Sequence, residues 1–176
     1  MTVKRSYLIS SIAVMLMNLS PLQAAEQDTV QAVIPWEAEG RVFQVDTKTM
    51  LFLGTLEGVM YVESSRGEMN EAFVMCPVMQ ELDIDTGKTK AHGHCEITAG
   101  ADDVVYAELS CEGEVGSCEG SFKLTDGEGS FAGISGSGKL RIRSPIRALI
   151  ADMAAGALLR VGSGLASVKD LNYRIP

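Results

Sequence analysis

Apolar and polar residues alternate along most of this chain, and glycines interrupt the alternation at short intervals. The pattern is clearest from Cys118 to Arg143, where glycines separate short alternating runs. Glycine accepts the positive φ that tight hairpin turns require and lets a sheet bend sharply. The sequence therefore predicts antiparallel β structure that closes into a small barrel. The residues expected on its inner face are Phe122, Leu124, Phe131, Ile134, Leu140 and Ile142, and those expected outside are Lys139, Arg141 and Arg143.

The residues before this stretch show the same alternation. Strands are expected over residues 41–46, 50–64, 72–85, 88–98 and 103–111. Asp85-Thr86-Gly87-Lys88 is typical of a turn between two paired strands, with glycine where φ is positive. Bulky side chains favour a barrel whose interior is filled. Those expected to point inward are Phe43, Leu51, Leu53, Phe73, Val105 and Phe122.

Two segments depart from the strand pattern. Residues 25–38 lack a clear period and contain Pro35, so they are expected to form a leader segment that lies along the domain, with Trp36 closing one end of the barrel. After Pro145, apolar residues recur at spacings of three and four, which favours a short helix over residues 146–155. Gly156 weakens that pattern, and a pair of strands fits nearly as well. A closing strand is expected over residues 168–175.

Residues 124–136, L-T-D-G-E-G-S-F-A-G-I-S-G, resemble the T-G-G-T-G-x-F-x-G-A-x-G signature of the allene oxide cyclase and dirigent group. The resemblance implies an all-β fold, a single eight-stranded antiparallel barrel with a central cavity that takes an apolar substrate without a cofactor. The chain departs from the signature at Asp126 and Glu128, and no catalytic position of those enzymes matches a residue here. No catalytic or cofactor-binding residue is therefore assigned. The glycines expected to shape the turns are Gly127, Gly129, Gly133 and Gly136.

The N-terminus has the features of a secretory signal peptide. Lys4 and Arg5 precede an apolar run over residues 7–19, and small residues follow, so residues 1–24 are expected to be removed. The apolar run is too short to span a bilayer, which argues against an integral membrane protein. Three regions are thus predicted: a signal peptide over 1–24, the leader over 25–38 and a β-barrel domain over 39–176. The expected location is periplasmic or secreted.

The charge of the chain argues against nucleic-acid binding. Removal of Lys4 and Arg5 takes the formal net charge from −8 to −10. Binding to phosphates needs a basic stripe, because counterion release supplies much of the affinity. The basic residues that do cluster are Lys139, Arg141, Arg143 and Arg147, and alternation along a strand explains them as solvated side chains.

All four cysteines lie in the expected mature chain. An even number of cysteines in an exported protein predicts two disulfides, for which three pairings exist. Cys111 and Cys118 flank a short loop, and Cys76 and Cys95 lie on two strands expected to pair around the turn at Gly87. The pairing favoured by this arrangement is Cys76–Cys95 with Cys111–Cys118.

The chain holds one concentration of metal-ligand residues. His92 and His94 are expected on the same face of a strand, close enough to share a copper or zinc ion. The thioethers of Met69, Met75 and Met79 suit Cu(I) as additional ligands. Two histidines alone form an incomplete site, so any binding is expected to be weak. An outward-facing, solvated histidine pair is the simpler interpretation.

Familiar catalytic signatures are absent from the sequence, which has no G-x-S-x-G, H-E-x-x-H or P-loop. The favoured hypothesis is therefore a barrel that binds a small, mostly apolar ligand or serves as a scaffold. An eight-stranded barrel is wide enough for packed side chains or for one small ligand. The alternative is a cofactor-free isomerase or cyclase on the same barrel, for which Glu57 or Glu108 is the candidate buried acid.

Overall fold

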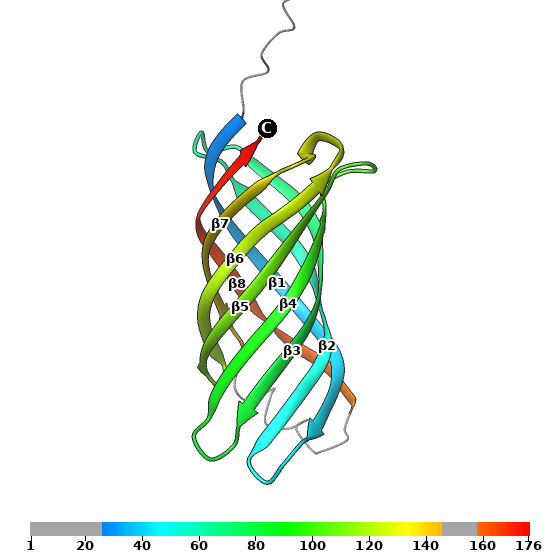
Figure 1. Ribbon diagram of the computed structural model, residues 1–176, viewed down its shortest axis with the longest axis vertical. Helices are drawn as coiled ribbons and strands as arrows, with labels where there is room; N and C mark the ends of the chain where they lie inside the picture. Colours follow the sequence, from blue (N-terminus) through cyan, green and yellow to red (C-terminus); the bar gives the residue numbers. More distant parts are fainter. Residues whose placement is uncertain (1–25, 146–157) are drawn as a thin grey trace, which may run out of the picture.

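A computed structural model describes residues 26–145 and 158–176. These residues form a closed barrel of antiparallel strands in which each strand pairs with its neighbour in the chain and β8 returns to β1 (Figure 1). The all-β, eight-stranded barrel predicted from the sequence is thereby confirmed. The strands are β1 (Glu26–Gln44), β2 (Thr49–Glu63), β3 (Met69–Asp83), β4 (Lys88–Thr98), β5 (Val104–Glu114), β6 (Ser117–Glu128), β7 (Ser135–Arg143) and β8 (Leu158–Ile175).

Alternate residues of each strand pack inside the barrel. In β1, five buried residues from Val30 to Ala38 alternate with more exposed ones. The inner face of the sheet carries mainly small and medium apolar side chains, since an eight-stranded lumen has little room. Phe122 on β6 and Val168 on β8 are the largest side chains that are completely buried. As predicted, Leu124, Ile134 and Leu140 are also buried, and Arg141 and Arg143 are exposed.

The inward direction is wrongly predicted for bulky residues of the first three strands. Phe43, Leu53 and Phe73 are 40–45% exposed and point outward, and Leu51 shares their face of β2. Only Val105 and Phe122 of the predicted set are buried. The error arises because the outer face of β1–β3 is itself rich in apolar residues, so alternation alone does not distinguish the two faces. These outward residues are Val33, Leu53, Val59, Tyr61, Phe73, Met75 and Met79.

Glycines identify the correct inner face of β2. Gly40 on β1 pairs with Gly54 on β2. A Cβ built on Gly40 would lie 2.5 Å from the Phe52 ring, and one on Gly54 would also collide with it. The two glycines therefore make the space that lets Phe52, rather than Leu51 or Leu53, occupy the lumen.

The prediction of a separate leader segment is wrong. Residues 26–38 belong to β1, which pairs with β2 on one side and β8 on the other. The β1–β2 pairing keeps the same register on both sides of Pro35, so the missing N–H of proline interrupts the ladder without ending the strand. Trp36 consequently lies in the middle of a strand rather than as a plug at one end.

The barrel closes through a last strand longer than expected. β8 begins at Leu158 and not near residue 168. The expected signal peptide over 1–24 and the expected helix over 146–155 lie outside the described residues. Within the described part of the chain, no helix is long and apolar enough to cross a bilayer.

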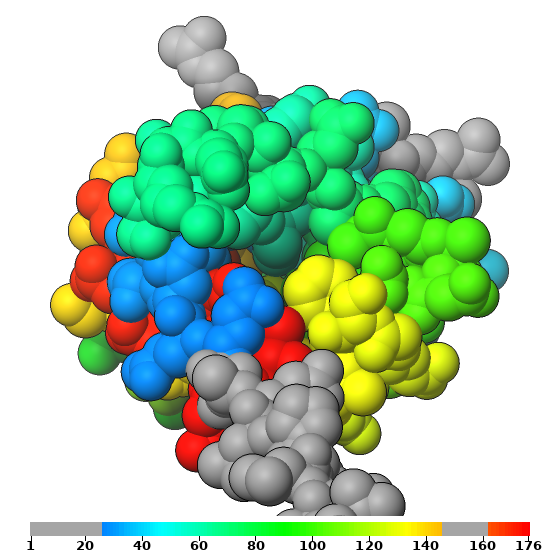
Figure 2. Space-filling view, turned by 90° about the horizontal axis from the view of Figure 1, so that it is seen from above, coloured from blue at the N-terminus to red at the C-terminus, as the bar shows by residue number. Residues whose placement is uncertain are grey.

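The glycine-rich stretch connects β6 to β7 through a single 3-10 turn, Gly129–Phe131. Gly129 and Gly133 adopt φ values of 64° and 74°, which side chains other than glycine rarely accept. Gly127 and Gly136 are needed for a different reason, because a Cβ on either would collide with the backbone of a neighbouring segment. Seen end-on, this connection, the β2–β3 and β4–β5 connections and the ends of β1 and β8 surround the middle of the barrel (Figure 2).

Two disulfides join inward-facing cysteines. Cys76 on β3 bonds Cys95 on β4, and Cys111 on β5 bonds Cys118 on β6. This is the pairing that the sequence favours. All four residues are buried in the lumen. Two disulfides in a domain of this size are typical of proteins that reside in an oxidising environment.

Candidate functional site

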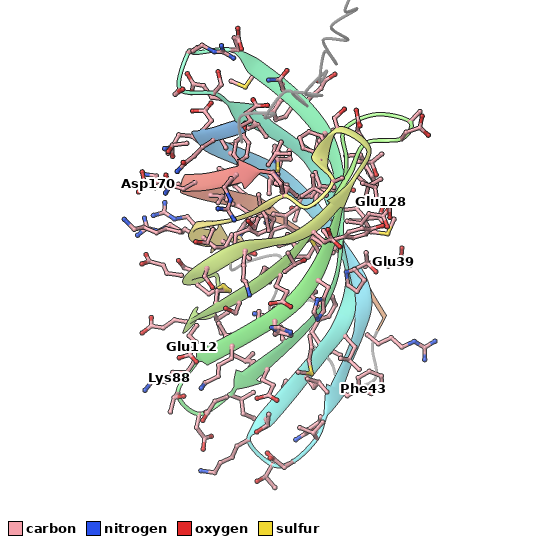
Figure 3. The ribbon with its side chains drawn as sticks, turned by 45° about the horizontal axis from the view of Figure 1, so that its top comes forward. Glu39, Phe43, Lys88, Glu112, Glu128 and Asp170 are labelled. Atoms are coloured by element: carbon pink, nitrogen blue, oxygen red, sulfur yellow. A yellow bond between two sulfur atoms is a disulfide. The ribbon has the colours of Figure 1, made fainter. Side chains whose placement is uncertain are left out.

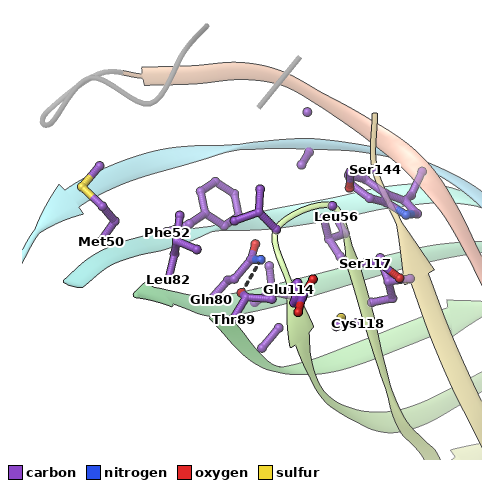
Figure 4. A pocket seen from close by; sticks show the side chains of 18 of the residues that line it. Met50, Phe52, Leu56, Gln80, Leu82, Thr89, Glu114, Ser117, Cys118 and Ser144 are labelled. Carbon is purple, nitrogen blue, oxygen red and sulfur yellow. Dashed lines mark hydrogen bonds between the residues drawn. The ribbon is translucent and has the colours of Figure 1, made fainter. Parts of the chain in front are cut away.

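The lumen contains a cavity at the end of the barrel where the β1–β2, β3–β4 and β5–β6 turns lie. Its volume is about 90 Å³. Residues from each of the eight strands contribute to its wall, which is mostly apolar (Figure 4). The side chains that define it include Val42, Met50, Phe52, Leu56, Val78, Leu82, Ala91, Leu109 and Ile142.

A few polar groups interrupt this apolar wall. The Gln80 side-chain amide donates a hydrogen bond of 2.8 Å to the Thr89 hydroxyl, which itself donates to the backbone carbonyl of Glu81 (Figure 4). Thr89 is 3% exposed, so these bonds satisfy a hydroxyl that is cut off from water. Glu114 is the one charged residue among the described residues of the wall, and it is exposed. The deep part of the cavity is thus neutral.

Trp36 forms part of the cavity wall and carries an unused hydrogen-bond donor. Its side chain packs against β8, where a Cβ on Gly164 would lie 2.8 Å from Cε2 of the indole. The indole N–H is buried, and no acceptor among the described residues bonds to it. A buried donor without a partner costs about 1–3 kcal/mol of stability. An acceptor that entered the cavity and reached this N–H would recover that free energy.

The rest of the lumen, towards the β6–β7 connection, is filled by packed side chains. A continuous cluster of buried residues extends from Trp36 to Ile97, Leu124 and Leu171. The predicted filled barrel therefore describes one end of the lumen, and the cavity occupies the other.

The candidate acids of the isomerase hypothesis lie outside the lumen. Glu57 pairs with Glu37, and Glu108 pairs with Lys123, both at outward-facing positions of their strands. Neither carboxylate reaches the cavity. Charged side chains such as Glu39, Glu112, Glu128 and Asp170 project from the outer face (Figure 3).

No protein family, curated protein or solved structure matches this chain. The site is therefore interpreted from its own geometry.

The luminal polar residues were missed at the sequence level, although a signal for them exists. Once Cys95 is placed in a disulfide with Cys76, every second residue of β4 must share its inward direction. Thr89 and Ala91 then face the lumen, as does Gln80 on β3. No such signal exists for Trp36, because the sequence does not show the cavity that lies beside its indole.

His92 and His94 lie together on the outer face of β4. Their ring centroids are 5.2 Å apart, and the rings are nearly perpendicular. No third histidine, cysteine, aspartate or glutamate joins them to form a metal-binding group within the described residues. The structure thus brings the two predicted ligands together on the surface, remote from the luminal cavity.

We expect Zn(II) and Cu(II) to bind this histidine pair with dissociation constants of about 1 µM or weaker, because two imidazoles on an exposed strand leave most coordination positions to water. Isothermal titration of the wild type, with His94→Ala as the control, measures this affinity. Nanomolar binding that disappears in His94→Ala would contradict the prediction.

Proposed function

We propose that the protein is an exported binding protein whose luminal cavity takes a small, neutral and mostly apolar molecule that carries one hydrogen-bond acceptor. The observation that supports this most directly is the apolar cavity beside the unused N–H of Trp36. The aliphatic wall excludes charged ligands, since burial of an unpaired charge is strongly unfavourable.

The size of the cavity limits the buried part of the ligand. An apolar cavity of about 150 Å³ accommodates a benzene molecule. The space here is about 90 Å³, so it encloses a group smaller than an aromatic ring. A larger ligand would extend towards Glu114 and Ser117, which line the cavity on either side of the turn between β5 and β6.

The donor on Trp36 selects among apolar ligands. A carbonyl or ether oxygen would accept a hydrogen bond from it, whereas a hydrocarbon of the same shape would leave it unpaired. One such bond contributes about 1 kcal/mol, which corresponds to roughly a fivefold difference in affinity.

Two properties beyond the cavity belong to the same proposal. The disulfides and the features of the N-terminal segment support a periplasmic or secreted location. The closed eight-stranded barrel and its apolar cavity support a distant relation to the allene oxide cyclase and dirigent group, which residues 124–136 resemble. The cavity would then correspond to the substrate cavity of that group.

The single tryptophan provides a direct test of the proposed function. In a ¹⁵N-labelled sample, the indole N–H of Trp36 gives one side-chain resonance, because Trp36 is the sole tryptophan. We expect acetone, which is smaller than an aromatic ring, to bind with a dissociation constant in about the millimolar range. The ketone should move this resonance downfield, and 2-methylpropene, a hydrocarbon of the same shape, should bind about fivefold more weakly without the downfield movement.

Two alanine-to-leucine variants serve as matched controls. Ala91 lines the cavity, so Ala91→Leu should fill it and abolish the response of the Trp36 resonance. Ala72 packs against the core cluster away from the cavity, so Ala72→Leu should leave the titration unchanged. A Trp36 resonance that ignores both probes in the folded wild type, or an undiminished response in Ala91→Leu, would refute luminal binding.

A further inference from the structure

The outer face of β3 and β4 brings methionine and histidine side chains side by side. Met79 on β3 is the direct cross-strand partner of His92 on β4. His94 follows two residues later on the same face, with its ring 5.2 Å from that of His92. Directly opposed side chains have Cβ atoms about 4.5–5.5 Å apart, so the Met79 thioether is within reach of an ion held by His92.

The turn between the two strands fixes this register. The Asp83 carboxylate accepts hydrogen bonds of 3.0 and 2.9 Å from the backbone N–H groups of Asp85 and Thr86, and these bonds hold the pKa of Asp83 below its usual range. Gly87 supplies the positive φ, 69°, that completes the turn. The Cys76–Cys95 disulfide ties the same two strands together on the luminal side. Met79 and His92 are therefore held opposite each other by covalent and hydrogen-bonded constraints on both sides.

The spacing of the two imidazoles fits a shared ion. A metal–nitrogen bond is about 2.0–2.1 Å long, so the centroids of two imidazoles on one ion lie on the order of 5–6 Å apart. The observed 5.2 Å falls in this range. Small rotations of two exposed side chains would then complete the geometry.

The identity of the third ligand decides which metal the site prefers. Glu108 of β5 lies directly opposite His94, but no carboxylate, thiolate or further imidazole among the described residues forms a metal-binding group with the two histidines. The cysteine nearest in sequence, Cys95, is oxidised and faces the lumen. A thioether is the ligand that remains, and thioethers favour Cu(I) over Zn(II).

The exposure of the methionines agrees with a ligand role. Methionine is usually buried, yet Met79 and Met75 are 42% and 40% exposed on the same face. Met75 is diagonal to His94 across the two strands, which places a second thioether beside the pair. Met69, expected from the sequence to join them, lies ten residues from Met79 at the start of β3, about 33 Å away along an extended strand.

We propose that Met79, His92 and His94 form a surface Cu(I) site on the outer face of β3 and β4, with Met75 positioned as an additional ligand. The site is separate from the luminal cavity and does not depend on the proposed ligand there. Its selectivity for Cu(I) distinguishes it from the weak divalent binding expected of the histidine pair alone.

Competition for Cu(I) tests the site. The purified protein is titrated with Cu(I) under anaerobic conditions with ascorbate, in the presence of the chromophoric chelator bathocuproine disulfonate. The absorbance of the chelator's Cu(I) complex measures the copper that the protein has not bound. We expect Cu(I) binding at a ratio of one ion per chain and at least about tenfold tighter than Zn(II). Met79→Leu should weaken Cu(I) binding at least about tenfold, because even changes to residues that merely support a ligand reduce metal affinity by about 10–100-fold.

Met69→Leu is the matched control, since it removes an exposed thioether from the same face of the same strand and should leave the affinity unchanged. Zn(II) binding should be the same in Met79→Leu and the wild type. X-ray absorption at the copper edge should show a Cu–S contribution that Met79→Leu reduces. Equal Cu(I) affinity of Met79→Leu and the wild type, or a preference for Zn(II), would overturn the proposal. The methionines would then be apolar residues of the outer face without a ligand role. The Trp36 resonance reports the luminal site independently in each variant.

Discussion

Gly136→Val is expected to destabilise the barrel by about 3 kcal/mol. Overpacking typically costs about 1–3 kcal/mol, and the upper value is expected here because the two atoms nearest the added Cβ are backbone atoms. Gly136 lies in β7 where it pairs with Tyr173 of β8. A Cβ at this position would collide with the carbonyl oxygen of Asn172 and lie 2.8 Å from Cα of Tyr173. Relief of the collision requires β7 and β8 to separate. Urea unfolding with the disulfides intact measures the change.

Two further valine substitutions separate the causes. Lys139→Val changes an exposed residue of the same strand and should alter the stability by less than about 0.5 kcal/mol. Gly133→Val introduces a β-branched residue at φ 74° and should cost about 1.5 kcal/mol through backbone strain. If Gly136→Val unfolds at the same urea concentration as Lys139→Val, the close approach of β7 and β8 at Gly136 is not structurally required.

Removal of the Cys76–Cys95 disulfide by replacing both residues with alanine is expected to destabilise the protein by about 3 kcal/mol on the chain-entropy model of loop closure. The bond joins residues 19 apart in the sequence, and the Cys111–Cys118 bond joins residues 7 apart. The shorter loop restricts the unfolded chain less, so the Cys111→Ala/Cys118→Ala variant should lose about 2.5 kcal/mol.

Thermal and urea unfolding of both double variants under non-reducing conditions tests this order. The two pairs of residues are all buried, so the loss of packed sulfur atoms is similar in each variant and the comparison isolates the loop length. A larger loss from the Cys111–Cys118 pair would show that native packing, rather than loop closure, dominates the contribution of these bonds.

The sequence was sufficient to predict the barrel because local patterns determine most of it. Glycine at Gly87, Gly129 and Gly133 marks turns by a requirement for positive φ, which is a property of the residue itself. The pairing of the cysteines follows from the order of the strands in a meander. These features need no knowledge of the tertiary contacts.

The direction of side chains in β1–β3 was not predictable in the same way. An apolar outer face gives Phe43 and Phe73 the same local pattern as inward residues, and the deciding contacts are those of Phe52 with glycines on two strands. Pro35 similarly suggested an irregular leader, although β8 and β2 hold the strand on both sides. Tertiary packing decided the outcome at each of these positions.

The candidate sites differ in the same way: the metal site follows from local sequence, and the luminal cavity depends on tertiary packing. The histidine pair was visible in the sequence because two residues apart on a strand means one face. The partnership of Met79 with His92 follows from counting back across the turn at Gly87, which the sequence also contains. The cavity beside Trp36 cannot be predicted from the sequence in this way, because its space depends on how side chains from distant strands fit together.

Closure of the barrel has a consequence for the order in which the protein folds. Every pairing but one joins strands that are consecutive in the chain. From β1 to β7 the hairpins form over short connections, and residues 144–157 join β7 to β8. The remaining pairing brings Glu26 beside Ile175 and requires nearly the whole described chain to be present. Until β8 docks, β1 and β7 are open edges that can recruit strands from other molecules. The sheet therefore remains vulnerable to aggregation until β8 has paired with both β7 and β1, so the docking of this one strand removes both open edges at once.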